Sequence, residues 1–278
     1  MNDLEVYERA PVVLVAFEVR HPMADPLTPA ESRMIKKRLS RRFPLELPGQ
    51  LTNFQITSGT ATQPEVTTER FPRFLDRAKT VSVSVRRDSL VIEASQYPGW
   101  TEFQELIAEA VDARMETAPV AGVERVGLRY INEVRVSADG EIDWAEWMHP
   151  SLLGPRSNTK IELPLGQWQG IGIYGSQPGQ MLLLRYGPRE GVAVDPSSDL
   201  RRIQRTDNGP FFLIDIDSFW APADAVPEYE RDMLIARCDE LHEPIRTLFE
   251  GIITDRLRDE VFRINDYDDH STSPRLLR

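Results

Sequence analysis

Two segments of this 278-residue chain carry the same alternation of apolar and polar side chains. Residues 124–136 read ERVGLRYINEVRV, and residues 12–21 read VVLVAFEVRH. A period of two is typical of a β-strand that buries one of its faces. Because VAFEV at 15–19 aligns with VGLRY at 126–130, we interpret the two strands as equivalent elements of a duplicated fold.

The chain between these strands predicts a helix, four strands and a second helix. Thr28 and Glu31 form a capping box, which predicts a helix from residue 29 to about residue 42. Thr101 and Gln104 form a second capping box at the start of another helix. The four strands are expected near residues 51–57, 70–75, 80–85 and 90–94.

The second half predicts a similar order of elements. Asp143 can cap a short helix, and a long amphipathic helix is expected from about Pro227, with a kink at Pro244. A polar insertion is expected at 187–210, and a disordered tail at 266–278. Strands are expected near residues 159–163, 168–174, 181–186 and 211–219.

These elements predict an α+β fold made of two β-α-β4-α halves, residues 1–118 and 119–265. If a pseudo-twofold axis relates the halves, their first strands pair antiparallel at the centre. The result is a curved, mainly antiparallel sheet of about ten strands with the helices on one face. Glu18 and Arg129 then share the other face as an ion pair. We therefore expect Arg129→Ala to destabilise the protein more than Arg135→Ala, and Glu18 and Arg129 to be energetically coupled.

Charge and composition exclude several classes of function. The formal net charge of −11 argues against broad binding to nucleic acids or anionic membranes. No stretch approaches the roughly 18 apolar residues of a membrane span, and the acidic first residues predict a cytoplasmic protein. The single cysteine, Cys238, permits neither a disulfide framework within the chain nor a zinc cluster. The sequence suggests no cofactor.

Three local patterns are better explained by structure than by chemistry. Residues 170–175 match GxGxxG by letter, but the turn-forming SQPG follows where a dinucleotide site needs a helix. Asp215 and Asp217 lie on one strand face and could hold a divalent cation, but the polar face of a strand is the preferred interpretation. The histidines lack the spacing of metal ligands.

Two sets of residues are candidates for a binding surface. The first lies on the predicted strands and consists of Glu18, Arg20, Arg129, Asn132 and Arg185. The second is a basic docking helix with Arg33, Lys36, Lys37 and Arg41, which is also compatible with an ordinary solvated helix face.

The sequence resembles a sporadically distributed bacterial family of uncharacterised proteins. The resemblance rests on GLRYIN at 127–132, FEVR at 17–20, YPGW at 97–100 and the closing helix from Leu234. It covers nearly the whole chain and implies one continuous unit but no activity. The patchy occurrence of the family resembles that of defence and toxin–antitoxin genes. The doubled order of elements is similar to the saddle of the TATA-binding protein, a fold-level analogy that implies no DNA binding.

We expect a non-enzymatic protein-binding module, such as an antitoxin, an immunity protein or a component of phage defence. Its partner would be a protein, for instance a toxin or a defence effector, and a homodimer is also compatible with the sequence. The alternative is a sensor that binds an anionic small molecule on the concave sheet face, where Arg20, Arg129 and Arg185 would contact the anion. An enzyme using Asp215 and Asp217 with a metal, and nucleic-acid binding by residues 33–42, are weaker hypotheses.

Overall fold

The computed structural model describes residues 7–55, 65–137, 140–154, 167–176, 178–195, 200–202 and 208–263. These residues form an α+β fold. The strands are β1 (Val12–Arg20), β2 (Leu45–Glu46), β3 (Gly49–Gln55), β4 (Glu65–Phe71), β5 (Arg73–Leu75), β6 (Val81–Val85), β7 (Ser89–Ala94), β8 (Arg125–Val134), β9 (Gly170–Gly175), β10 (Gly179–Glu190) and β11 (Pro210–Ala221).

The helical elements lie between and after these strands. They are the α-helices α1 (Pro29–Leu39), α2 (Trp100–Thr117), α3 (Arg231–Ile252) and α4 (Asp255–Leu257), the 3-10 turns η1 (Trp144–Glu146) and η2 (Pro150–Leu152), and the π-helical turn η3 (Arg258–Phe262). No helix among the described residues combines the length and apolar character that a membrane crossing requires.

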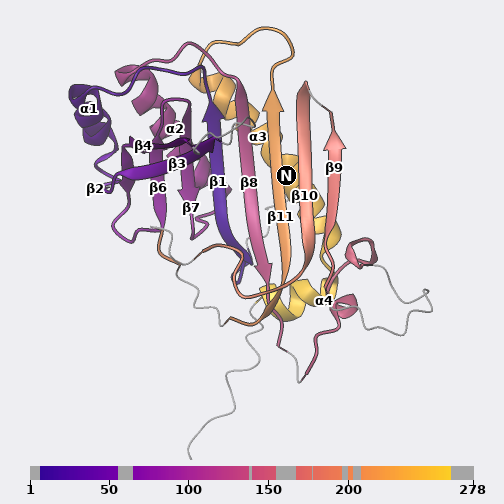
Figure 1. Ribbon diagram of the computed structural model, residues 1–278. Coiled ribbons are helices and arrows are strands. Elements are labelled where there is room, and N and C mark those ends of the chain that lie inside the picture. The colour runs from indigo at the N-terminus through magenta and orange to yellow at the C-terminus, as the bar shows by residue number, and fades with distance from the viewer. Residues whose placement is uncertain are drawn as a thin grey trace, which may run out of the picture.

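Nine strands form one sheet in the order β2-β5-β6-β7-β1-β8-β11-β10-β9 (Figure 1). Every neighbouring pair is antiparallel. The predicted pairing of the two alternating strands is confirmed, because β1 pairs with β8 and Phe17 lies opposite Leu128. The described residues give a sheet of nine strands where about ten were expected, and β3 and β4 pair only with each other.

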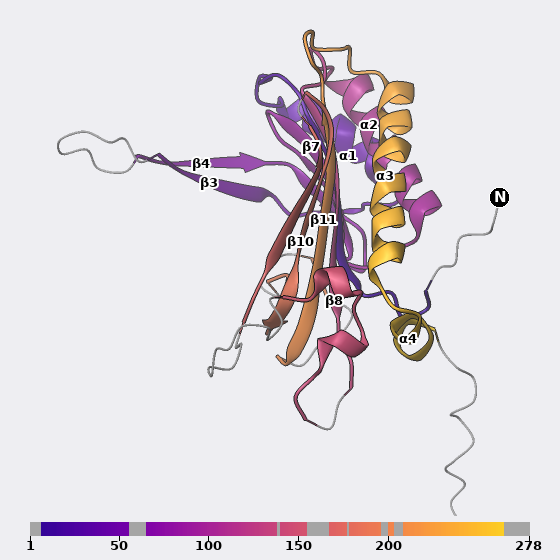
Figure 2. The ribbon, with the colours of Figure 1, turned by 90° about the vertical axis from the view of Figure 1, so that its right-hand side faces the viewer.

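The β3–β4 hairpin forms an arm that leaves the sheet. Its strands pair from Gly49 opposite Phe71 to Gln55 opposite Glu65. The arm projects away from the sheet on the side opposite α2 and α3 (Figure 2). We call the sheet face on the side of the arm, which α2 and α3 do not cover, the open face.

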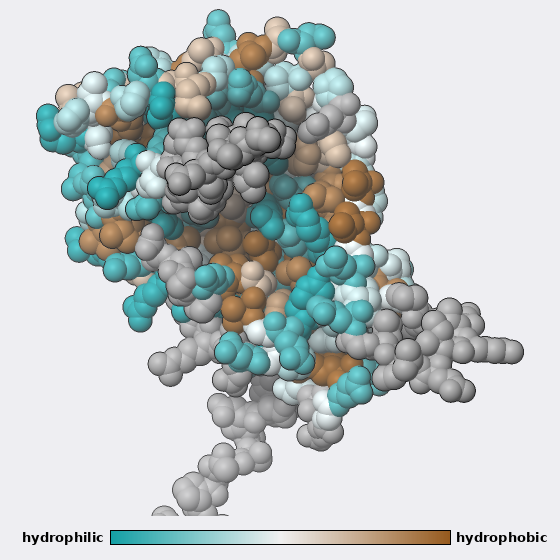
Figure 3. All heavy atoms as spheres, viewed as in Figure 1, coloured by the Kyte–Doolittle hydropathy of each residue, from teal (hydrophilic) through white to brown (hydrophobic). Residues whose placement is uncertain are grey.

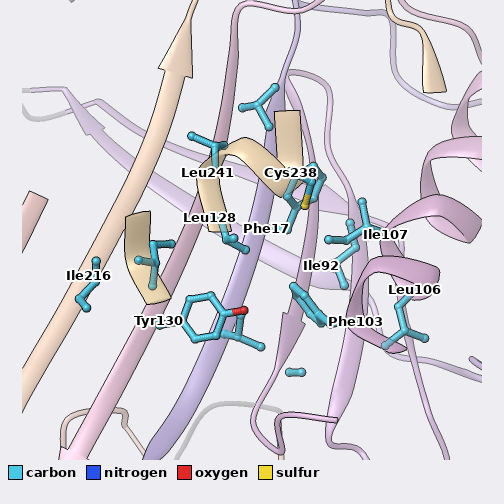
Figure 4. Close-up of a cluster of buried hydrophobic side chains, with 14 of the residues drawn as sticks. Phe17, Ile92, Phe103, Leu106, Ile107, Leu128, Tyr130, Ile216, Cys238 and Leu241 are labelled. Carbon is cyan, nitrogen blue, oxygen red and sulfur yellow. The ribbon is translucent and has the colours of Figure 1, made fainter. Parts of the chain in front are cut away.

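The hydrophobic core lies between the sheet and the helices α2 and α3. Phe17, Leu128 and Ile216 come from three neighbouring strands and are completely buried. They belong to one core cluster with Phe103 of α2 and Cys238 of α3, and Phe17 and Leu128 lie close to Cys238 (Figure 4). Burial raises the pKa of the Cys238 thiol, which therefore stays protonated and acts as a small apolar side chain.

The helix boundaries agree with the sequence in part. The capping box of Thr28 and Glu31 is present, with both reciprocal hydrogen bonds. The predicted capping box of Thr101 and Gln104 is wrong, because the N-cap of α2 is Gly99, two residues before Thr101. The chain turns into α2 at Gly99, whose φ of 94° favours glycine.

The second half departs from the predicted repeat at its helix. Short 3-10 turns, the first capped by Asp143, stand where the first half has α1. α3 begins at Arg231 rather than Pro227 and continues through Pro244. The predicted strand at 159–163 and tail at 266–278 lie outside the described residues, as does part of the insertion at 187–210. Strands from before and after the expected boundary at residue 118 belong to one sheet, because β1 pairs with β8.

Candidate functional site

The open face carries an arginine–aspartate–arginine cluster at the centre of the second half. Asp215 of β11 accepts two hydrogen bonds from Arg129 of β8, both 2.8 Å long. Arg185 of β10 lies directly opposite Asp215 and donates to the same carboxylate at 3.2 Å. The Asp215 side chain is 5% exposed, whereas Arg129 and Arg185 are 44% and 41% exposed. One buried carboxylate thus holds two arginines at the surface.

The electrostatics of this cluster follow from its shared carboxylate. The hydrogen bonds to Asp215 raise the pKa of Arg129, so its charge is stabilised in place. Burial raises the pKa of Asp217 on the same strand face, although Arg125 and Arg129 oppose the shift. Both carboxylates therefore face guanidinium groups. Among the described residues there is no group of three or more His, Cys, Asp or Glu that could hold a metal ion.

A second charged cluster lies beside the first, where β1 meets β8. Glu18 accepts hydrogen bonds from Arg20 at 2.9 Å and from Arg125 at 2.8 Å. Arg125 reaches Glu18 across Gly127, where a Cβ atom would lie 2.6 Å from the Arg125 Nη1 atom. The small residue at 127 therefore leaves room for this guanidinium.

The predicted ion pair between Glu18 and Arg129 is wrong. The two residues do share the open face, but the register sets Glu18 opposite Gly127, and Arg129 opposite Ala16. Arg129 instead turns to β11, where Asp215 offers a bidentate acceptor. The pairing of Arg129 with Asp215 could not be predicted from local sequence, because Asp215 lies 86 residues further along the chain.

We expect Arg129 and Asp215 to be coupled in a double-mutant cycle. The coupling free energy from Arg129→Ala and Asp215→Ala should be about 1 kcal/mol, because Asp215 is buried while Arg129 is partly screened by solvent. The same cycle with Glu18→Ala and Arg129→Ala serves as the control and should be additive within about 0.5 kcal/mol. Urea denaturation of the variants measures both. Coupling in the second cycle but not in the first would contradict these contacts.

Glu133 anchors the connection between β10 and β11 to the open face. Its side chain is 1% exposed and forms ion pairs with Arg135 and Arg202. It also accepts a hydrogen bond of 2.6 Å from the backbone N–H of Ala193. Arg135 donates in addition to the carbonyl oxygens of Gly191, Gly209 and Pro210. Arg135 makes more hydrogen bonds than Arg129. We therefore expect Arg135→Ala to destabilise the protein more than Arg129→Ala, which is the reverse of the expectation from the sequence.

The predicted strand residues do not form one site. Glu18, Arg20, Arg129 and Arg185 lie on the open face, but Arg20 belongs to the Glu18 cluster rather than to Asp215. Asn132 lies on the opposite, helix-covered side, where its amide donates to the carbonyl oxygen of Ile214 at 3.0 Å. It lines a cavity there.

This helix-side cavity has a volume of about 160 Å³. Tyr130 donates a hydrogen bond of 3.2 Å to the hydroxyl of Tyr97. The rings of Trp100 and His242 stack with their centres 3.8 Å apart and their planes 2° from parallel. Burial, together with Arg246, lowers the pKa of His242 to about 4, so the ring is neutral at pH 7. The residues that line the cavity are Tyr7, Ala10, Pro11, Val12, Tyr97, Gly99, Trp100, Tyr130, Asn132, Ile216, His242, Ile245, Arg246, Phe249 and Glu250.

The predicted basic helix, α1, packs against α2. Lys36 pairs with Glu46 at 2.7 Å. Arg38 pairs with Glu116, and Arg42 contacts three glutamates of α2. The remaining basic residues of the prediction are exposed, namely Arg33, Lys37 and Arg41. Part of the basic surface is thus neutralised within the molecule.

Sequence reasoning missed the burial of Glu133 and the cavity. In the sequence, Glu133 is one of several charged residues on an alternating strand. Its burial depends on contacts with Ala193 and Arg202, which lie between β10 and β11. The segments YPGW and GLRYIN contribute four residues to the cavity, namely Tyr97, Trp100, Tyr130 and Asn132. The sequence alone did not indicate that these residues lie together. The GxGxxG letters form the edge strand β9, which pairs antiparallel with β10.

Comparison with known proteins adds no relative. No family model, no curated protein and no solved structure matches this chain.

Proposed function

We propose that this protein is a non-enzymatic protein-binding module, and that its partner sits between the arm and the open face. The observation that carries this proposal is the projection of the β3–β4 arm from that face (Figure 2). A ribbon of two strands is only marginally stable in water unless it packs against another surface. A bound protein would supply that surface.

The chemistry of the open face defines the kind of partner. Its two charged clusters carry four arginines (Arg20, Arg125, Arg129 and Arg185) against three carboxylates (Glu18, Asp215 and Asp217). The surplus is one positive charge in a chain whose formal net charge is −11. Arg129 and Arg185 retain N–H groups that make no hydrogen bond within the described part of the chain. Carboxylates of an acidic partner are suitable acceptors for them.

Apolar contact is available beside these arginines. Ile171 and Ile173 lie on the open face of β9, opposite Arg185 and Leu183, and are 62% and 63% exposed. Figure 3 looks onto the open face, where hydrophobic and hydrophilic surfaces adjoin. Exposed apolar residues flanked by charged ones are typical of a protein interface. We infer a partner surface with carboxylates beside apolar side chains.

The anionic small-molecule alternative rests on Arg129 and Arg185 alone. They lie on either side of Asp215, so a small carboxylate or phosphate could bridge their remaining N–H groups. Arg20 would not take part, because it pairs with Glu18 on β1. This alternative makes no use of the arm, which is why we favour the protein partner.

We also propose that the chain is related to the family it resembles and that its two halves arose by duplication. The strand order β5-β6-β7-β1 beside β8-β11-β10-β9 supports two related halves. A cytoplasmic role as an antitoxin, an immunity protein or a phage-defence component is the biological form of the proposal. It is motivated by the resemblance carried by GLRYIN and YPGW.

Affinity capture from the source cell tests the protein-binding function with three variants. The first shortens the arm by joining Leu51 to Glu69 through Asn-Gly, a turn that closes a two-residue hairpin. The second is Ile173→Lys on the open face. The matched control is Val226→Lys, because Val226 is also an exposed apolar residue, at 49%, but precedes α3.

The proposal predicts one protein that wild type and Val226→Lys retain equally. The shortened arm and Ile173→Lys should each lower its recovery at least tenfold, and a thermal melt should show that both variants remain folded. A wild-type protein that always elutes alone, or a captured protein that all variants retain equally, would contradict the proposal. Stabilisation by small carboxylates or phosphates, abolished by Arg185→Ala, would favour the alternative.

A further inference from the structure

The helix-side cavity has the size of a small ring compound. It lies beneath α3, between the chain before β1 and the start of α2, and its volume is about 160 Å³. An apolar protein cavity of roughly 150 Å³ is large enough to bind benzene. The space is therefore sufficient for one ring, or two small fused rings.

The walls of the cavity are flat and apolar. Val12, Ile216 and Ile245 contribute aliphatic surface, and Tyr7, Trp100, Tyr130 and Phe249 contribute rings. Trp100 stacks on His242, so two parallel rings contribute to one wall. Aromatic rings favour offset-stacked or edge-to-face neighbours over aliphatic ones of the same area. A planar ligand suits such walls better than a bulky aliphatic one.

The polar groups of the cavity are few, and apart from Arg246 and Glu250 they carry no charge. Tyr130 donates to the hydroxyl of Tyr97, whose own hydrogen makes no bond within the described residues. The Asn132 Nδ2 group is used by Ile214, which leaves its Oδ1 atom as an acceptor. Tyr97 can thus donate to a ligand and Asn132 can accept from one.

The charged residues around the cavity are already paired. Glu250 accepts hydrogen bonds from Tyr7 and Arg258, and Arg246 donates to Glu243. His242 is neutral, as shown above. A charged ligand would have to enter without an opposite charge to balance it, which is costly in an apolar site.

We propose that this cavity is a binding site for a neutral, planar aromatic molecule of one or two fused rings with one hydrogen-bonding group, as in phenols and indoles. The site is distinct from the open face, because it lies on the other side of the sheet. It would make the protein responsive to a small aromatic compound, independently of any protein partner.

Calorimetry and ligand-observed NMR with the full chain test the site. Phenol and indole should bind saturably and compete with each other, cyclohexanol should bind at least tenfold more weakly, and benzoate should not bind. Val12→Phe fills the cavity from β1 and should weaken indole binding at least tenfold. The control Met115→Phe enlarges a half-buried side chain of α2 outside the cavity and should leave binding unchanged.

A milder variant keeps the proposal testable if Val12→Phe does not fold. Tyr97→Phe removes only the hydroxyl group, so it should weaken phenol up to about tenfold and leave benzene unchanged, in line with the loss of one hydrogen bond. Failure of every ring compound to bind up to its solubility limit would overturn the proposal. So would binding that Val12→Phe and Tyr97→Phe leave intact, or a preference for benzoate over phenol.

Discussion

Glu133→Ala is expected to lower the free energy of unfolding by about 3 kcal/mol or more. The Glu133 side chain is 1% exposed, and its removal leaves Arg135 and Arg202 without their shared carboxylate. Breaking a buried ion pair from one side costs roughly 3–5 kcal/mol. The N–H of Ala193 loses its acceptor as well. Urea denaturation followed by circular dichroism measures the effect.

The matched control is Glu260→Ala, which removes a glutamate that is 54% exposed and pairs with Arg256. This change should cost less than about 1 kcal/mol, because solvent screens exposed ion pairs. Glu133→Gln should fall between the two, since the amide keeps one acceptor oxygen. If Glu133→Ala were no more destabilising than Glu260→Ala, the connection between β10 and β11 would not be anchored as the structure shows.

Acidification should destabilise the protein by about 3 kcal/mol between pH 7 and pH 4 through His242 alone. The pKa of His242 falls from 6.5 in the unfolded chain to about 4 in the folded protein. In this interval the unfolded chain binds a proton that the folded protein does not, so stability rises with pH across the window and is lost as pH falls. The residues that oppose or favour its charge are Arg246, Glu243 and Asp239.

His242→Phe isolates this contribution, because phenylalanine can stack on Trp100 but cannot titrate. The variant should lose about 3 kcal/mol less than wild type between pH 7 and pH 4 in urea titrations. Burial also lowers the pKa of His21, so some pH dependence should persist in the variant. Equal pH dependence in both proteins would show that His242 is not held neutral by its surroundings.

The central pairing of the sheet could be predicted from local sequence. Alternation in β1 and β8 requires each strand to bury one face, and that requirement sets Phe17 and Leu128 on the same side. The capping box at Thr28 is equally local. The start of α2 was missed because the N-cap is Gly99, with its positive φ, which lies two residues before the predicted N-cap Thr101.

The candidate site could be predicted only in part, because its contacts depend on register between distant strands. The sequence placed Glu18 and Arg129 on one face, but the acceptor for Arg129 is set by β11, not by β1. The residues 51–57 read as a strand of the sheet, whereas β3 pairs with β4 outside it. Alternation predicts that a strand exists, and not which sheet it joins.

Hydrogen exchange in the complex with the captured partner tests whether the arm and the open face bind a protein. Amides of a two-stranded ribbon without packing exchange quickly, and contact with a partner slows them. We expect binding to protect the arm, Gly49–Gln55 and Glu65–Phe71, and the edge strand β9. Protection confined to α1, with its exposed Arg33 and Lys37, and no change in the arm would contradict this expectation.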